Sequence, residues 1–189
     1  MPDFIGYWSR LPRKKKIYAA AGGGLLLLIL TAGYFIGRST PGIETAARQT
    51  AELADNIRRH YSQKPGYWGL NTASVLKDGI APQGMAAEGK LLNALGLPVS
   101  VGAGFEGGII MPGIRSFDIA FDGLSAAECR ELAAYSFSDR QNLGLISVSI
   151  KNNSRTETFS WGGENPLPVD PDRAKALCRK GGGVLWRFE

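Results

Sequence analysis

An uncharged apolar block near the N-terminus is the feature that most constrains this chain. It runs from Ile17 to Gly37 and contains no charged side chain over 21 residues. As an α-helix it would measure roughly 31 Å, which matches the hydrocarbon thickness of a bilayer. Residues 17–37 are therefore expected to form a single transmembrane helix.

The charges on either side of this block predict its orientation. Residues 1–16 carry five basic side chains against Asp3, a net charge of +4, whereas only Arg38 follows the block directly. Lysine and arginine favour the cytoplasmic side of a membrane. The expected organisation is a basic cytoplasmic stub (1–16), the span (17–37) and an external domain (38–189). In a Gram-negative bacterium the domain would lie in the periplasm, anchored to the inner membrane.

A cleaved secretory signal is the alternative to a membrane anchor. Such a signal has an apolar region of about 7 to 15 residues followed by an A-x-A-like cleavage site. The block here is longer, and the segment "GYFIGRSTPG" offers no A-x-A site. A retained or specially processed anchor is therefore favoured over ordinary signal removal.

The position of the positive charge argues against a nucleic-acid partner. The whole chain has a net charge of +5 and a pI near 9.3. Because residues 1–16 account for +4 of this, only +1 is left for residues 17–189. Affinity for phosphate requires a concentrated basic face, so no nucleic-acid binding is predicted.

Beyond the apolar block, the hydrophobic period becomes that of an amphipathic helix. From Ile43 onward, apolar or small residues recur at the i, i+3, i+4, i+7 spacing. They are Ala46, Ala47, Thr50, Leu53, Ala54, Ile57 and Tyr61. Thr40 can cap this helix with Pro41 in its first turn, or the helix continues from the membrane and bends at Pro41. The stripe is expected to pack on the chain's own globular domain.

Three shorter helices are predicted from capping signals. One lies within 71–82, a second opens with a capping box, and a third has proline in its first turn. Their expected signals are Thr72 as cap with Gly79 and Pro82 as stop; Ser125 with Glu128; and Asp170 with Pro171, ending at Gly181.

Five segments have the alternation or β-branched content of strands. They are "PVSV" from Pro98, "FDIAF" from Phe117, "LISVSI" from Leu145, "TETFSW" from Thr156 and "VLWRF" from Val184. Glycine-rich loops and few long crossovers favour antiparallel pairing. The predicted fold class is α+β, with the long N-terminal helix packed on an antiparallel sheet.

The two cysteines are consistent with an external domain. Cys129 and Cys178 both lie beyond the predicted span, each on a predicted helix. One disulfide in an oxidising compartment is expected, with two buried free thiols as the alternative. A zinc site would need more ligands than these cysteines and the single His60 provide. No metal or cofactor is predicted.

In the order of its elements the chain resembles type IV pilins, and it is most similar to the type IVb class that includes the thin-pilus pilins of conjugative plasmids. The resemblance rests on the segments Glu44–Met85, Phe117–Ala133 and "AKALCRKGGGVLWRFE" at the C-terminus. It implies a pilin-like domain whose C-terminal region is closed by a disulfide. It also implies partners in a pilus or secretion machine, including other copies of the chain.

The leader departs from the pilin pattern. Type IV prepilins are cut after a glycine that follows a basic leader, and the mature helix usually carries glutamate at its fifth position. The candidate processing sites are Gly22, Gly23 and Gly24, but cleavage at Gly24 would place Ile29 at the fifth position, and cleavage at Gly22 would place Leu27 there. The favoured hypothesis is therefore an anchored, non-catalytic component of a type IV pilus, conjugation or secretion machine. The alternative is a major pilin that is cut at an atypical glycine and polymerises into a filament.

An anchored periplasmic enzyme or ligand-binding module is a further alternative. A histidine-based nucleophile system would have to use His60, which lies on the predicted amphipathic helix. Some of the candidate acid–base carboxylates fall on turn or capping positions; the four are Asp118, Asp122, Glu128 and Glu131. No enzymatic activity is predicted. For a binding function, Trp161 in a glycine-rich loop is the candidate partner contact, with local packing as the competing explanation.

Overall fold

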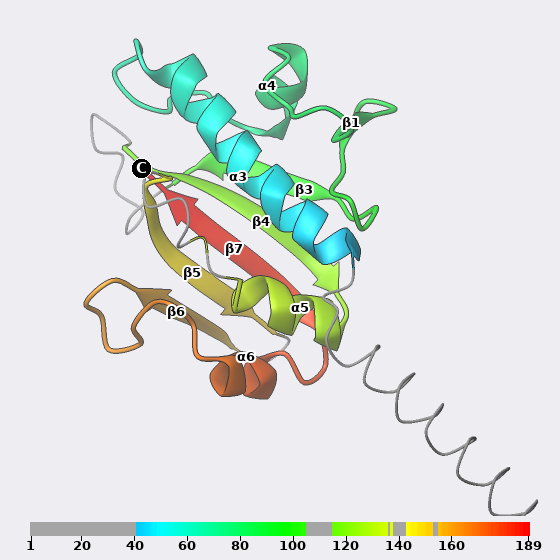
Figure 1. Cartoon of the computed structure of the whole chain (residues 1–189). Helices are drawn as coiled ribbons and strands as arrows, with labels where there is room; N and C mark the ends of the chain where they lie inside the picture. Colours follow the sequence, from blue (N-terminus) through cyan, green and yellow to red (C-terminus); the bar gives the residue numbers. More distant parts are fainter. Residues whose placement is uncertain (1–40, 105–114, 136, 138–142, 153–154) are drawn as a thin grey trace, which may run out of the picture. The chain divides into compact units, whose positions relative to one another are not determined.

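Helix α3 (Pro41–Tyr61) lies across one face of a five-stranded sheet (Figure 1). Its predicted apolar stripe is confirmed, because every member is buried: Ile43, Ala46, Ala47, Thr50, Leu53, Ala54, Ile57 and Tyr61. The side chain of Thr50 is satisfied within the helix by donating to the Ala46 carbonyl at 2.9 Å. The amphipathic pattern therefore correctly predicted both the helix and the side of it that packs on the domain.

The computed structural model describes residues 41–104, 115–135, 137, 143–152 and 155–189. The expected basic stub, the span at 17–37, the cap Thr40 and the glycines at 22–24 all lie outside these residues. Among the helices that are described, none is both long and apolar enough to cross a membrane.

The sheet has the order β3-β4-β7-β5-β6, and every neighbouring pair is antiparallel. The strands are β3 (Val99–Ala103), β4 (Phe117–Leu124), β5 (Leu145–Lys151), β6 (Thr156–Ser160) and β7 (Gly182–Phe188). All five predicted strands and their antiparallel pairing are confirmed. A small hairpin of β1 (Ala86–Ala87) and β2 (Lys90–Leu91) was not predicted, since two residues carry no periodic pattern.

The C-terminal strand β7 is the centre of the sheet and of the core. Its inward-facing residues Val184, Trp186 and Phe188 are at most 1% exposed. On β4 they face Phe121, Ile119 and Phe117 in turn. The aromatic rings pack closely, with centroids 5.0 Å apart for Phe121 and Trp186 and 5.5 Å apart for Phe117 and Phe188. Such ring pairs add to the free energy of area burial.

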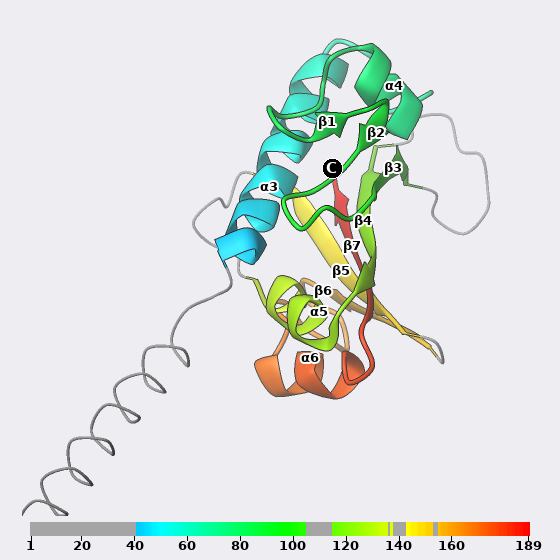
Figure 2. The same cartoon turned by 90° about the vertical axis from the view of Figure 1, so that its right-hand side faces the viewer.

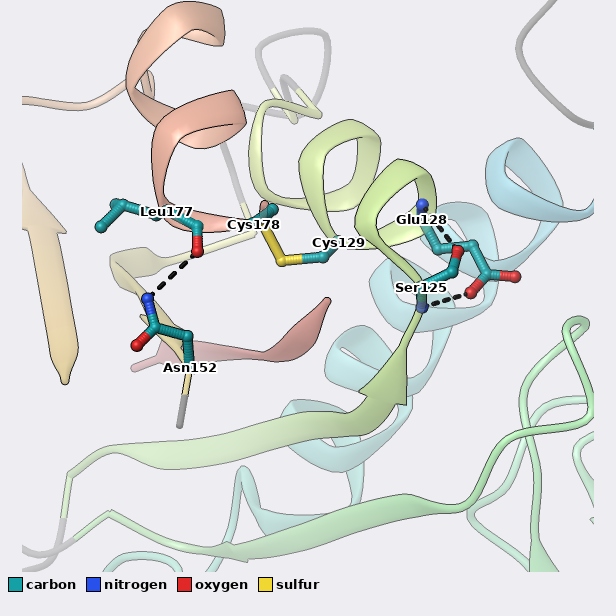
Figure 3. Close-up of a disulfide and its surroundings, with 6 residues drawn as sticks. All are labelled: Ser125, Glu128, Cys129, Asn152, Leu177 and Cys178. Atoms are coloured by element: carbon teal, nitrogen blue, oxygen red, sulfur yellow. Dashed lines mark hydrogen bonds between the residues drawn. A yellow bond between two sulfur atoms is a disulfide. The ribbon is translucent and has the colours of Figure 1, made fainter. Parts of the chain in front are cut away.

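Helix α5 (Ala126–Ala133) begins with the predicted capping box. The amide of Glu128 donates to the Ser125 hydroxyl, and the amide of Ser125 donates to the Glu128 carboxylate at 2.8 Å (Figure 3). Helix α6 (Pro171–Leu177) has the predicted Asp170 cap and Pro171 in its first turn. Its predicted end at Gly181 was wrong. Cys178 already caps the helix, because the chain must turn back through Gly181, at φ +74°, to enter β7.

Helix α4 (Thr72–Lys77) corrects a second sequence-based expectation. The cap is Asn71, whose side chain accepts from the Ser74 amide at 2.9 Å, and not Thr72. The hydroxyl of Thr72 instead accepts from the Val101 amide at 2.9 Å on the outer edge of β3. An unpaired strand edge invites pairing with another chain, so this contact protects the edge.

The predicted disulfide between Cys129 and Cys178 is confirmed (Figure 3). It joins α5 to the end of α6, and both cysteines are buried. Next to it, the Asn152 side chain donates to the Leu177 carbonyl at 3.1 Å, linking α6 to the end of β5. The disulfide therefore links the C-terminal third of the domain to α5, the helix that follows β4.

Shortening the buried Leu53 should test the contact between α3 and the sheet. Leu53→Ala leaves a cavity in a close-packed core and is expected to lower the unfolding free energy by about 2–5 kcal/mol. Its exposed neighbour provides the control, since Glu52→Ala should change it by no more than about 0.5 kcal/mol. Urea unfolding of the detergent-solubilised chain measures both, and equal effects would contradict the packing described for α3.

Removal of the disulfide should be costly because it closes a long loop. The cysteines are 49 residues apart. In the chain-entropy treatment, Cys129→Ala with Cys178→Ala is expected to lower the unfolding free energy by about 4 kcal/mol. Reduction of the wild-type chain with dithiothreitol should produce a similar loss of stability in the same urea titration. A double variant as stable as the oxidised wild type would contradict a stabilising role for the bond.

Candidate functional site: the open face of the sheet

None of the described helices covers the face of the sheet turned away from α3 and α5 (Figure 2). Alternate residues of the strands point to this side, and the strand register arranges them in rows across the sheet. We call these rows the open face. They consist of Asp122, Gly183, Lys151 and Thr156; of Ala120, Leu185, Ser149 and Thr158; and of Asp118, Arg187, Ser147 and Ser160.

A groove of about 400 Å³ lies in the open face and draws its lining from β4, β5, β6 and β7. Its floor is made of small or apolar residues, namely Gly183, Ala120 and Leu185, and one side is lined by the hydroxyls of Ser147, Ser149, Thr156 and Thr158. A Cβ at Gly183 would lie 2.5 Å from Asp122 Oδ1 and 3.0 Å from the Phe121 carbonyl oxygen, so a larger residue would displace its neighbours. The absence of a side chain there keeps the groove open.

The charges differ between the two ends of the groove. At one end, Arg187 donates to both oxygens of Asp118, at 2.8 and 3.0 Å. This two-pronged geometry is the strong form of the arginine–carboxylate contact. At the other end, Lys151 and Asp122 flank Gly183. Among the described residues neither forms an ion pair within 4.0 Å. Lys151 is thus an exposed cation available to a ligand or partner.

Trp161, the predicted partner contact, directly follows Ser160 of the open face. Its indole N–H donates to the Leu145 carbonyl at 2.9 Å, while the residue is 63% exposed. The polar edge of the ring is thus used locally while its apolar surface is presented to solvent, and the partner contact stays a prediction. A tryptophan held in this way offers a large contact area at low entropic cost.

The loop that carries Trp161 is tied to the edge strand β6. The Ser160 amide donates to the Asn165 carbonyl at 3.0 Å, and the Leu167 amide donates to the Ser160 carbonyl at 3.3 Å. The Asn165 side chain donates to the Thr158 carbonyl at 3.4 Å. These bonds occupy backbone groups on the outer side of β6 and hold the loop as a defined projection.

Among the residues that the structure describes, those considered for catalysis do not form one site, and all but Asp122 have structural partners. His60 Nε2 lies 3.6 Å from Asp78 Oδ2, Glu131 lies 3.6 Å from Arg130, and Glu128 completes the cap of α5. Only Asp118 and Asp122 share a surface, the open face. No group of three or more histidine, cysteine, aspartate or glutamate side chains that could hold a metal ion occurs within the described parts of the chain.

The sequence-based prediction missed the charged and apolar members of the open face, above all Lys151, Leu185 and Arg187. A signal was present in the segment "SVSIK", where polar residues alternate with apolar ones. This pattern is typical of a strand with one solvent-facing side. It does not show which strands are neighbours, so it could not place these side chains in one groove.

Two solved structures share the architecture of this domain. TcpA, a type IV pilin from Vibrio cholerae El Tor biotype, superposes with a TM-score of 0.54 at 13% identity, covering 79% of this chain and 100% of TcpA. A type IVb pilin from Salmonella typhi superposes with a TM-score of 0.52 at 18% identity, covering 77% of this chain and 97% of that pilin. The helix packed on an antiparallel sheet is thus the fold of type IV pilins, as the resemblance implied.

The Bundlin family model matches residues 41–184. The chain therefore belongs to the Bundlin family, and it is a type IV pilin-like subunit, a structural component of pili. A comparison with curated protein sequences gives no significant match.

On the side of the sheet covered by α3, Tyr67 packs on the buried Phe117 of β4 with ring centroids 4.7 Å apart. Burial raises the pKa of Tyr67 above its usual value; Arg58 opposes this effect and Glu189 adds to it. The folded state therefore favours the protonated Tyr67 hydroxyl. Because the pKa of Tyr67 is higher in the folded state than in the unfolded state, this contribution to stability is complete below the unfolded pKa and is lost as the pH rises through the folded pKa.

Tyr67→Phe should therefore reduce the loss of stability in alkali. The unfolding free energy of the wild type is expected to fall more steeply than that of the variant between about pH 9 and pH 11, where tyrosines ionise. Urea titrations of both proteins across this range measure the difference. Identical pH profiles would show that the environment of Tyr67 does not favour its protonated form.

Proposed function

We propose that this chain is a non-catalytic, membrane-anchored subunit of a type IV pilus or of a related conjugation or secretion machine. In this proposal residues 17–37 cross the bacterial inner membrane once, residues 1–16 are cytoplasmic, and the 38–189 domain is periplasmic. The observation that carries it is the extent of the family match, which begins at residue 41, directly after the expected span. The uncharged block and its basic flank supply the orientation.

A filament subunit processed at one of the glycines 22–24 is the second candidate. It is favoured by the completeness of the pilin domain, since the superpositions cover 100% and 97% of the two solved pilins. Pilins self-assemble into filaments, so other copies of the chain are natural partners. Against it stands the apolar residue at the fifth position after each cut considered, where pilins usually carry glutamate.

The N-terminus of the mature protein distinguishes these two candidates. We expect a start at Met1 or Pro2 in protein recovered from membranes, whether or not a prepilin peptidase is present in the cells. Intact mass and N-terminal sequencing measure it, with a known prepilin in the same cells as the control for peptidase activity. A peptidase-dependent start at Gly23, Gly24 or Leu25 would overturn the permanent anchor and establish the filament-subunit proposal.

A further inference from the structure

The Trp161 loop (residues 161–165) presents an exposed aromatic ring, and the groove of the open face has an apolar floor. Within the described residues Trp161 is the most exposed large hydrophobic residue, at 63%, ahead of Trp68 at 47% and Tyr135 at 36%. Exposed aromatic residues of this kind are enriched where proteins contact one another.

The loop is a preformed projection. Its hydrogen bonds to β6 and the bond from the indole N–H to Leu145 fix the ring before any partner arrives. Gly163 allows the tight path, because a Cβ there would lie 2.5 Å from the Ser160 hydroxyl oxygen. A rigid contact loses little conformational entropy on binding.

The loop also carries a negative charge at its tip. Glu164 is exposed and, among the described residues, forms no ion pair within 4.0 Å. At one end of the groove Lys151 carries the opposite charge and likewise has no such partner; the carboxylate of Asp122 lies on the other side of Gly183. Between its charged ends the groove has a floor of glycine, alanine and leucine, which suits an aromatic ring.

We propose that the Trp161 loop of one copy of this chain docks in the open-face groove of a second copy. The indole covers Leu185 and Ala120, and Glu164 pairs with Lys151. The loop cannot fill the groove of its own chain, because its hydrogen bonds hold it beyond Ser160 with the ring exposed. Since loop and groove are different surfaces, the contact is heterologous and can repeat from copy to copy.

This proposal rests on the proposed function as a subunit of an assembly, and it adds the surface through which copies meet. It also assigns a role to Lys151 and Glu164, two exposed residues that do not take part in the core. A groove of about 400 Å³ lies within the range of sites that enclose a large side chain or a small ligand. The charge match favours a copy of this chain over a ligand of unspecified chemistry.

Site-specific photo-crosslinking in cells that express the full chain tests the contact. A Trp161→p-benzoylphenylalanine variant should give, on irradiation, an adduct of two chains whose linked peptide falls within residues 147–158 or 182–187. Trp68→p-benzoylphenylalanine is the matched control, since Trp68 is also exposed but is not part of the loop. It should give no adduct to these peptides.

Charge reversal in the Trp161→p-benzoylphenylalanine variant then tests the proposed ion pair between Glu164 and Lys151. Lys151→Glu should lower the adduct yield about threefold, as expected for an exposed ion pair, and Glu164→Lys should lower it similarly. The two together should restore the yield, because the pair is re-formed with its signs exchanged. Retention of the Cys129–Cys178 disulfide, assayed by thiol labelling, shows that each variant is folded.

The proposal is overturned by an adduct to a different protein, to a non-protein ligand or to another surface of this chain, and by the absence of any adduct from a folded variant. It is also overturned if the double charge reversal fails to restore the yield. Electron microscopy and the N-terminal analysis test the proposed function separately. If filaments assemble without the adduct, only the proposed docking of the Trp161 loop is rejected. If the adduct forms in cells without filaments, assembly into a filament is rejected and the docking contact is retained.

Discussion

The burial of one stripe of α3 against the inner face of the sheet is the contact on which the rest of the structure depends. Neither surface could exist alone in water, because each is a continuous row of apolar side chains. Ala46, Ala47, Ala51 and Ala54 are buried on this stripe together with the larger side chains of Ile43, Leu53 and Ile57. Single-sided burial of this kind is usual for an antiparallel sheet.

The choice of side has a functional consequence. Because α3 covers one face, the other must be compatible with solvent, and apart from Leu185 its residues are hydroxyl-bearing, charged or small. Twelve positions in three rows thereby become one polar surface with a groove. The outer edges of the sheet are occupied by hydrogen bonds, from Thr72 to β3 and from the 161–167 segment to β6. The open face is not used in this way. A subunit built in this way can meet other copies through side chains and not by extending its sheet.

Local signals were recovered well from the sequence because they act over short distances. The Ser125–Glu128 box and the Asp170–Pro171 start depend on groups three residues apart, and the stripe from Ile43 to Tyr61 depends on helical period alone. The errors arose where tertiary contacts competed. Thr72 was available as a cap, but β3 occupies its hydroxyl and Asn71 caps the helix instead. The third helix, α6, ends before Gly181 because the chain turns at this glycine to enter β7.

The sequence by itself determined the amphipathic helix, the five strands, the class of fold and the pairing of the only two cysteines, since periodicity, capping and cysteine count are properties of neighbouring or unique residues. Only the tertiary structure decided that the C-terminal strand is central, and that Lys151, Gly183 and Asp122, from three strands, lie side by side. Strand order is set by the packing of the whole chain, and alternation within one strand carries no information about its neighbours. The open face and its groove are therefore products of the fold.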